Sequence, residues 1–229
     1  MHNQLIHRTR LARYLTLLLL LPLMLILSGC LDSDSDSNTT NNPDEQHPQV
    51  RLTLAIEGAA FGDLTLTLYP EQAPISVDNF LTYVDEGFYD GLLIHRVVPG
   101  FVIQGGGFDT QGQQQPTRDP IHNESNNGLS NLKGTLAMAR TNDPHSATSQ
   151  FYINLADNPG LDYQPATASQ DARWGYAVFG EVTQGMENLE VIEYLPTNAN
   201  DVPFVEVTIK KAERINNPSN TPTDTGSTP

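Results

Sequence analysis

Residues 93–108 read Leu-Ile-His-Arg-Val-Val-Pro-Gly-Phe-Val-Ile-Gln-Gly-Gly-Gly-Phe, an apolar stretch that carries one arginine, Arg96, and one long amide, Gln104. Two apolar runs flank the turn signal Pro99-Gly100, which predicts two buried strands joined by a tight turn. An arginine in a buried strand is costly unless its guanidinium group finds acceptors. Arg96 is therefore either paired inside the fold for structural reasons or part of a site.

The segments around this stretch favour a mainly β domain. Apolar and polar residues alternate over 52–56 and again over 64–68, which predicts a hairpin with one buried face. Apolar residues at helical spacing between Pro74 and Gly87 predict a helix. With about eight short strands, closure into a barrel is the natural way to remove sheet edges. The remaining strands are predicted at 92–98, 101–103, 134–139, 150–155, 174–182 and 205–209, with a second helix over 186–192.

The N-terminus has the pattern of an export signal. Residues 1–14 contain arginines and no acidic residue, and residues 15–27 are nearly all leucine. The small pair Ser28-Gly29 before Cys30 resembles the lipobox of bacterial lipoproteins. That resemblance implies cleavage before Cys30 and lipidation of its sulfur, which would anchor the protein to a membrane. The alternative is an ordinary signal peptide followed by an incidental cysteine.

Composition divides the chain into four parts. We expect a signal peptide over 1–29, a lipidated cysteine with a disordered polar tether over 30–49, one folded domain over 50–214 and a disordered tail over 215–229. The single cysteine leaves no partner for a disulfide or a thiolate metal site. A net charge of −15 argues against binding of nucleic acid.

The usual enzyme motifs are weak in this sequence. His122 and Glu124, with Asp119 nearby, lack the regular spacing of metal ligands on one element. His145 and Ser146 are adjacent, but neighbours in sequence rarely form a base and nucleophile, and no third orienting group is evident. Neither a metal site nor a nucleophilic site is predicted from these residues.

Two further features have ordinary structural explanations. The three glycines 105–107 follow a strand but precede no helix, so a bulge or a close backbone approach is favoured over a phosphate cradle. His95 lies in an apolar run and is interpreted as a core histidine with its hydrogen bonds satisfied. What remains around Arg96 is an amide and many apolar and aromatic groups, so an enzyme built on them would need no covalent chemistry and no cofactor.

Five blocks of sequence, in this order and spacing, resemble the cyclophilin family of peptidyl-prolyl cis-trans isomerases. The bacterial periplasmic members resemble the chain most, through 123–129 and 144–147. The resemblance covers residues 50–214. The five blocks are 88–91, 94–106, 134–140, 149–154 and 178–182.

The resemblance implies a closed eight-stranded antiparallel β-barrel capped by two α-helices and an enzyme that accelerates rotation about X–Pro bonds. It implies that Arg96 is the catalytic arginine and that Gln104 orients it. A non-catalytic module that holds proline-containing segments as a chaperone or scaffold is the alternative function. The residues that match the family's substrate-binding positions are Phe101, Val102, Ala139, Arg140, Gln150, Tyr152, Leu161 and Tyr176.

Three positions depart from the usual pattern of the family. Val102 stands where methionine is common, Tyr152 where phenylalanine is usual, and Gly160 where a large aromatic residue is common. The Tyr152 hydroxyl needs a partner or water and would otherwise make the pocket floor more polar. The glycine predicts a more open rim.

The expected partners follow from these observations. We expect proline-containing exported polypeptides as substrates, a lipid anchor as the membrane contact, no nucleic acid, and a monomer. Leu31, not aspartate, follows Cys30. Since aspartate at that position is the retention signal of the inner membrane in the best-known bacteria, its absence favours the periplasmic face of the outer membrane.

Overall fold

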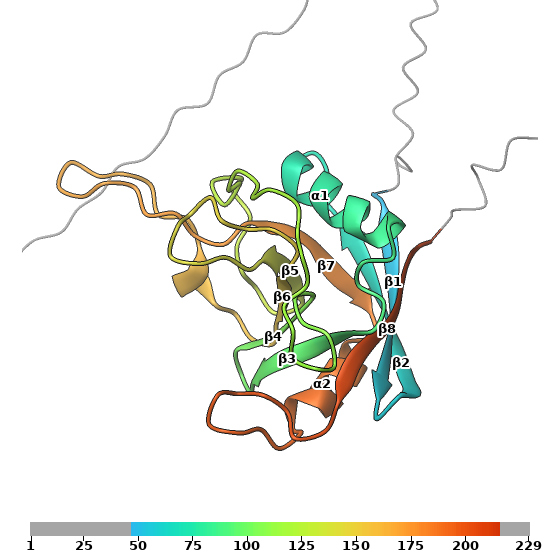
Figure 1. Ribbon diagram of the computed structural model, residues 1–229. Helices are drawn as coiled ribbons and strands as arrows, with labels where there is room; N and C mark the ends of the chain where they lie inside the picture. The colour runs from blue at the N-terminus through green and yellow to red at the C-terminus, as the bar shows by residue number, and fades with distance from the viewer. Residues whose placement is uncertain (1–46, 216–229) are drawn as a thin grey trace, which may run out of the picture. The chain divides into compact units, whose positions relative to one another are not determined.

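The computed structural model describes residues 47–215, which form an eight-stranded antiparallel β-barrel with two α-helices (Figure 1). The predicted signal peptide, Cys30, and most of the predicted tether and tail lie outside the described residues. Within the described part, no helix is long and apolar enough to cross a membrane. The elements are β1 (Gln49–Ile56), β2 (Ala59–Leu68), α1 (Pro74–Asp85), β3 (Leu92–Val98), β4 (Val102–Gly105), β5 (Thr135–Met138), β6 (Phe151–Asn154), the 3-10 turn η1 (Pro159–Leu161), β7 (Val178–Gln184), α2 (Met186–Glu193) and β8 (Val207–Arg214).

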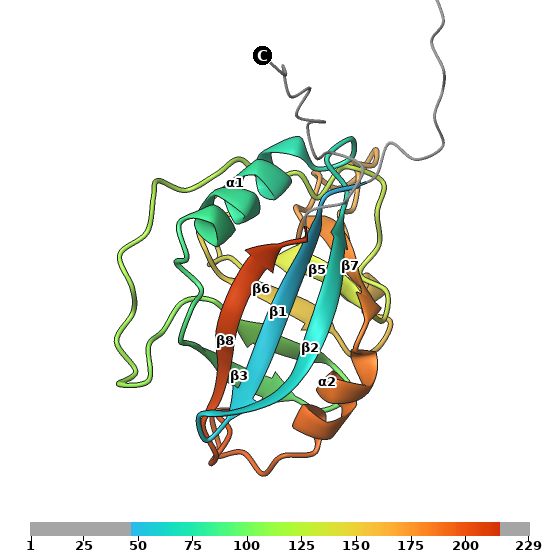
Figure 2. The same ribbon diagram turned by 90° about the vertical axis from the view of Figure 1, so that its right-hand side faces the viewer.

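The strands close in the order β1-β2-β7-β5-β6-β4-β3-β8, and β8 pairs with β1 to complete the barrel. Figure 2 shows β8, β1 and β2 side by side on the near wall. Helix α1 covers one end of the barrel and α2 lies at the other (Figures 1 and 2). The predicted fold class, a closed eight-stranded antiparallel barrel with two helices, is confirmed.

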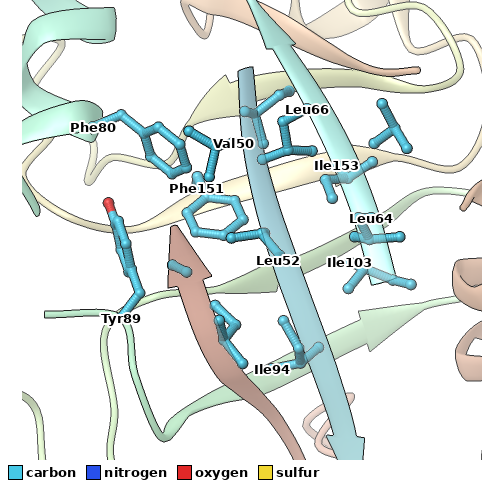
Figure 3. Packing of buried hydrophobic residues seen from close by; sticks show 14 of the residues in the cluster. Val50, Leu52, Leu64, Leu66, Phe80, Tyr89, Ile94, Ile103, Phe151 and Ile153 are labelled. Carbon is cyan, nitrogen blue, oxygen red and sulfur yellow. The ribbon is translucent and has the colours of Figure 1, made fainter. Parts of the chain in front are cut away.

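The core fills the barrel and is capped by aromatic residues. Alternate residues of β1, such as Leu52 and Leu54, point inward and are almost completely buried. Phe80 of α1 and Tyr89 both pack against Phe151 of β6, with ring centroids 5.4 Å and 5.5 Å away (Figure 3). Full burial of a large apolar side chain contributes about 1.5–3 kcal/mol. The domain is therefore stabilised by packing without any disulfide.

The barrel includes a little more chain than predicted at its N-terminal boundary. Gln49, assigned to the tether from sequence, is the first residue of β1. The carbonyl of Pro48 accepts a hydrogen bond from Leu68 (2.9 Å), and that of Gln49 accepts one from Ile215 (2.9 Å). Polar composition alone did not reveal that these residues have strand partners.

The strand predicted over 174–182 begins only at Val178. Residues 174–177 run instead beside η1, where the N–H of Tyr176 donates to the carbonyl of Leu161 (2.9 Å). A Cβ on Gly175 would lie 2.4 Å from the backbone nitrogen of Tyr163, so only glycine permits this approach. The apolar pattern continues through the segment, but its partner is a loop and not a strand.

Candidate active site

A bulge in β3 brings Arg96 to the outer wall of the barrel. The register of β3 against β4 shifts between Ile94 and Arg96, which leaves His95 as the extra residue. Ile94 and Val97 both belong to the barrel core although they are three residues apart, which strict alternation would not allow. The bulge therefore turns Arg96 out of the core and toward a pocket on the outer face.

That pocket has a volume of about 260 Å³ and lies over β3, β4, β5 and β6. This is slightly below the range of about 300–1,000 Å³ that is typical of drug-sized ligands, so the pocket suits a small group such as one side chain. Of the ten site residues predicted from sequence, nine line it, and Gln150 is the exception. The lining residues are Arg96, Phe101, Val102, Gln104, Ala139, Arg140, Tyr152, Leu161 and Tyr176.

Strand alternation builds the floor of the pocket. Ile103 of β4 and Ile153 of β6 are paired and point into the barrel core. Their neighbours Val102 and Tyr152 point the other way and form a second apolar cluster on the outer wall. Both of these floor residues are buried, so the pocket has an apolar base.

The hydroxyl of Tyr152 does not make the floor more polar, because it is directed into the protein. It donates a hydrogen bond to Oδ1 of Asn131 (2.7 Å), which is fully buried. Burial raises the pKa of Tyr152 well above its usual value, so the hydroxyl stays protonated and remains a donor. The ring alone is therefore presented to the pocket.

Arg96 forms a partly exposed ion pair and not a buried one. Its Nε lies 3.4 Å from Oδ2 of Asp201, and the two side chains are 36% and 41% exposed. Within residues 47–215, no hydrogen bond occupies its two terminal nitrogens. Nothing in the sequence had marked Asp201, which lies in the loop that precedes β8.

Gln104 is paired with Arg96 across β3 and β4, as a brace for the arginine would require. Its Nε2 donates to Oε1 of Gln150 (2.9 Å), and within the described domain no hydrogen bond joins Gln104 to Arg96. Gln150 thus reaches the pocket only through Gln104. This hydrogen bond fixes the amide of Gln104 and leaves its own Oε1 as an acceptor.

The glycine run next to β4 is a close backbone approach, as predicted. Gly106 has φ +82°, and a Cβ there would lie 2.8 Å from the ring of Tyr89. A Cβ on Gly107 would lie 2.6 Å from the side chain of Gln150. Side chains at these positions would displace a core aromatic residue and the amide pair beside Arg96.

Arg140 forms another part of the pocket wall. Its guanidinium group lies 4.4 Å from the ring centroid of Tyr176. It donates to the carbonyls of Gly175 (3.1 Å), Trp174 (3.0 Å) and Thr141 (2.8 Å). This set of contacts ties the segment before β7 to the end of β5.

His95 differs from the prediction of a fully satisfied core histidine. Its Nδ1 is buried without a hydrogen-bond partner in the described domain. Its ring packs edge-on against Phe108, with centroids 4.7 Å apart. Burial, with a further contribution from the charge of Arg96, lowers the pKa of His95 to about 4.

Glu124, which the sequence offered as a weak candidate metal ligand, has a structural role at the start of α1. The carboxylate of Glu124 accepts hydrogen bonds from Ile75 N–H (3.0 Å), Ser76 N–H (2.7 Å) and Ser76 Oγ (2.7 Å). It thereby caps α1, whose own N-cap residue, Ala73, has no side-chain hydrogen bond to offer. Across residues 47–215, no group of three or more His, Cys, Asp or Glu side chains is placed to hold a metal ion.

His145 and Ser146 do not form a base–nucleophile pair. The His145 Nδ1 accepts from the N–H of Asn123 (3.1 Å), whereas Ser146 Oγ donates to the carbonyl of Asp143 (2.7 Å). Ser146 shapes the turn in which it lies, whereas His145 links that turn to Asn123.

Comparison with known proteins agrees with this geometry. The family described as "Cyclophilin type peptidyl-prolyl cis-trans isomerase/CLD" matches residues 51–214. The chain belongs to the cyclophilin family. A cyclophilin-type isomerase from Cryptosporidium parvum has a similar crystal structure, with TM-score 0.60 and 27% identity over 75% of this chain and 99% of that one.

Curated relatives are more similar in sequence. Peptidyl-prolyl cis-trans isomerase A of Dickeya dadantii is 46% identical over 67% of this chain and 80% of its own length. Isomerase B of Escherichia coli is 46% identical over 65% of this chain and 92% of its own length. An isomerase of Streptomyces antibioticus is 48% identical over 66% of this chain and 92% of its own length. The cyclophilin described here is therefore a peptidyl-prolyl cis-trans isomerase, which favours catalysis over the non-catalytic binding module.

Proposed function

We propose that the pocket beside Arg96 is where this isomerase turns an X–Pro bond, with Arg96 as the catalytic residue. One observation carries the proposal: Arg96 lines a small pocket with an apolar floor, while its terminal nitrogens have no partner within residues 47–215. A proline ring fits the apolar floor made by Val102 and Tyr152. The cation at the edge of that floor is then beside the bond that rotates.

The chemistry needs no bond to be broken. Amide resonance sets a rotational barrier of about 18–20 kcal/mol, so an X–Pro bond takes tens of seconds or longer to turn in water. In the twisted transition state the prolyl nitrogen regains its lone pair. A fixed donor beside that nitrogen stabilises the twisted state more than either planar state. Arg96 suits this role because it is always charged and no proton has to move.

The other pocket residues position the substrate. Gln104, fixed by its hydrogen bond to Gln150 and paired with Arg96 across β3 and β4, acts with Arg96 by orienting it beside the substrate. Phe101 and Leu161 complete the apolar walls around the ring. The backbone of Ala139 and Arg140 holds the peptide, and Tyr176 forms the rim.

Isomerase kinetics on short X–Pro peptides test this assignment. Cis–trans exchange measured by NMR should be accelerated by the wild-type domain and much less by Arg96→Ala. Arg51→Ala is the matched control, since Arg51 lies on β1 and pairs with Glu213. Equal acceleration by Arg96→Ala and wild type would refute the role of Arg96.

We further propose that the protein is an exported lipoprotein that assists the folding of other exported proteins. The support is in the sequence: a basic segment, a leucine-rich segment, and Ser28-Gly29 before Cys30. The absence of aspartate after Cys30 favours the periplasmic face of the outer membrane. Lipidation would supply more than one acyl chain and hence stable attachment.

Membrane fractionation tests this localisation. Wild type should sediment with outer membranes and incorporate labelled fatty acid, whereas Cys30→Ser should do neither. Recovery of wild type with the inner membrane would overturn the outer-membrane assignment. Wild type without lipid label would overturn the lipoprotein assignment.

We also propose that the domain acts as a monomer. Each of the eight strands has two neighbours in the closed barrel, so no strand edge is left to pair with a second copy. Sedimentation equilibrium of the folded domain should give the monomer mass across a hundredfold range of concentration.

A further inference from the structure

A second hollow, of about 490 Å³, opens beside the pocket that contains Arg96. The two share Arg140, Leu161 and Tyr176 in their walls. A polypeptide bound in the first pocket would therefore pass the mouth of the second within a few residues, since an extended chain advances about 3.4 Å per residue. The second hollow is therefore placed to contact the side chains of residues that flank the proline.

The floor of the second hollow is held in position by hydrogen bonds. Arg140 binds the carbonyls of Trp174 and Gly175, and its guanidinium group lies over the ring of Tyr176. Trp174 packs edge-on against His145, with centroids 5.1 Å apart. These contacts hold the floor of the hollow in place before a ligand binds, which lowers the entropy cost of binding.

The mouth of the hollow is open because residue 160 is glycine. A Cβ built on Gly160 would meet no atom within 4 Å. Arg173 lies at the base of the loop of residues 164–173, which projects at the upper left of Figure 1, and its Nη2 donates to the carbonyl of Gly160 (3.3 Å). The loop is pinned at its base by paired backbone hydrogen bonds between Gln164 and Arg173 (2.9 Å and 2.8 Å). An exposed guanidinium group therefore stands at an unobstructed entrance.

The charge around the second hollow differs from that of the rest of the domain. Residues 47–215 contain six arginines, and in this part of the chain only Arg140 and Arg173 lack an ion pair with a carboxylate. Both line the second hollow, in a protein whose net charge is −15. The four paired arginines are Arg51, Arg96, Arg118 and Arg214.

One acidic residue, Asp162, also lines the hollow, but its carboxylate is already bound. Its Oδ1 accepts hydrogen bonds from the N–H (2.8 Å) and Nδ2 (2.9 Å) of Asn131, and its Oδ2 accepts one from Ser130 Oγ. It therefore does not neutralise either arginine by a direct contact. Within residues 47–215, both guanidinium groups keep their charge unneutralised by a carboxylate, and Arg173, whose hydrogen bond to Gly160 uses only Nη2, has the free N–H donors.

We propose that the second hollow binds the carboxylate of an aspartate or glutamate side chain on the same polypeptide whose proline occupies the first pocket. The inference rests on the function proposed above. A guanidinium group presents paired N–H donors that match a carboxylate, and charge-assisted hydrogen bonds of this kind are stronger than neutral ones. The substrate class is thus a proline-containing segment with an acidic residue a few positions from the proline.

Peptide pairs test the preference. Each peptide contains one proline, and the peptides are made in pairs. At one of the three positions on either side of the proline, one member of the pair carries glutamate and the other carries glutamine, its neutral isostere. Wild type should prefer glutamate in kcat/KM at one position by about three- to tenfold, the range expected for a charge-assisted contact open to solvent. The preference should shrink as salt is raised from 50 mM to about 500 mM. No preference for glutamate at any position would overturn the proposal.

Two variants locate the effect. Arg173→Gln removes the charge at the entrance, and Gly160→Phe fills the mouth of the hollow without a backbone clash. In each variant, the ratio of kcat/KM for the glutamate peptide to that for the glutamine peptide should fall to about one. Arg51→Gln is the control: it makes the same substitution at an arginine on β1, and it should keep the wild-type ratio. A ratio that survives Arg173→Gln would reject the assignment to this hollow.

The only tryptophan of the chain, Trp174, lies in the second hollow and reports binding without turnover. Titration with the glutamate peptide should change its fluorescence at lower concentration than titration with the glutamine peptide. If all peptides are isomerised without this difference, the second-site proposal fails while the proposed function stands. If binding shows the difference but Arg96→Ala isomerises as well as wild type, the proposed catalytic role fails instead.

Discussion

The carboxylate of Asp201 lies 3.4 Å from Nε of Arg96, and the carbonyl of the same residue accepts a hydrogen bond from the N–H of Val97 (2.8 Å). Asp201 has φ +62°, a left-handed conformation that aspartate and asparagine tolerate better than most residues. One loop residue is thus fixed to β3 by its backbone and directs the arginine by its side chain. The pairing occupies Nε and leaves the terminal nitrogens for the pocket.

Asp201→Asn should lower kcat more than it raises KM. Asparagine accepts the same backbone conformation, so the loop is retained while the charge that directs Arg96 is removed. We expect a loss of about 1.5- to fivefold in kcat, since a solvent-exposed ion pair contributes only about 0.2–1 kcal/mol. Isomerase kinetics at low and high salt provide the measurement, with Glu213→Gln, at the exposed pair with Arg51, as the control. Unchanged kcat would show that Asp201 does not position Arg96.

Arg96→Ala should reduce kcat/KM by about 10²- to 10³-fold, the usual cost of removing a donor that acts in the transition state. Arg96→Lys should recover only part of the loss, because an ammonium group cannot reproduce the fork geometry. Melting temperatures should stay close to that of wild type, since the side chain is 36% exposed. Unfolding of Arg96→Ala at room temperature would instead support a structural role.

Tyr152→Phe should destabilise the domain by about 1 kcal/mol, the typical contribution of one hydrogen bond. The change removes the donor to Oδ1 of Asn131, which keeps a longer contact from Nδ2 of Asn154 (3.3 Å). The ring and its burial are retained, so turnover should fall far less than in Arg96→Ala. Urea unfolding measures the first effect, and peptide exchange measures the second. A large loss of turnover with unchanged stability would mean that the hydroxyl contacts substrate.

Glu124→Ala should cost about 2–3 kcal/mol of unfolding free energy, because it leaves the donors of Ile75 and Ser76 at the start of α1 without their acceptor. Glu124→Gln should cost less, since an amide oxygen can still accept. Glu190→Gln, at an exposed pair with Lys133, is the control and should change stability by less than about 1 kcal/mol. Urea unfolding at pH 7 distinguishes these cases, and equal stability of all three variants would contradict the capping role.

His95 should make the domain less stable in acid. Its pKa is lowered to about 4 in the folded state, below the usual 6.5, so the unfolded state binds more protons between these values. The contribution of His95 to the free energy of unfolding is therefore fully present above pH 6.5. It is lost as the pH falls toward 4, which lowers the free energy of unfolding by about 3 kcal/mol. His95→Phe keeps an aromatic ring beside Phe108 and should remove this part of the pH dependence. Parallel pH profiles for the two proteins would show that His95 titrates normally.

Local sequence pattern was sufficient for much of the fold. Alternation in 52–56 and 64–68 predicted the first hairpin, and apolar spacing after Pro74 predicted α1, because these signals arise within one element. The site residues were found through motif similarity, and the structure then gathered nine of them around one pocket. Asp201 and Asn131 were not found, since each lies in a loop and acquires its role only through a contact far along the chain.

The stretch from Leu92 to Val98 separates what sequence and structure each contribute. Its composition specified a strand and raised the question of Arg96, but a run with apolar residues on both sides of His95 and Arg96 does not reveal which residues face inward. The answer depends on the bulge at His95, which arises from the pairing of β3 with β4 and from barrel closure. Residue identities therefore carry the chemistry of the site, whereas long-range strand pairing places Arg96 on the outer wall.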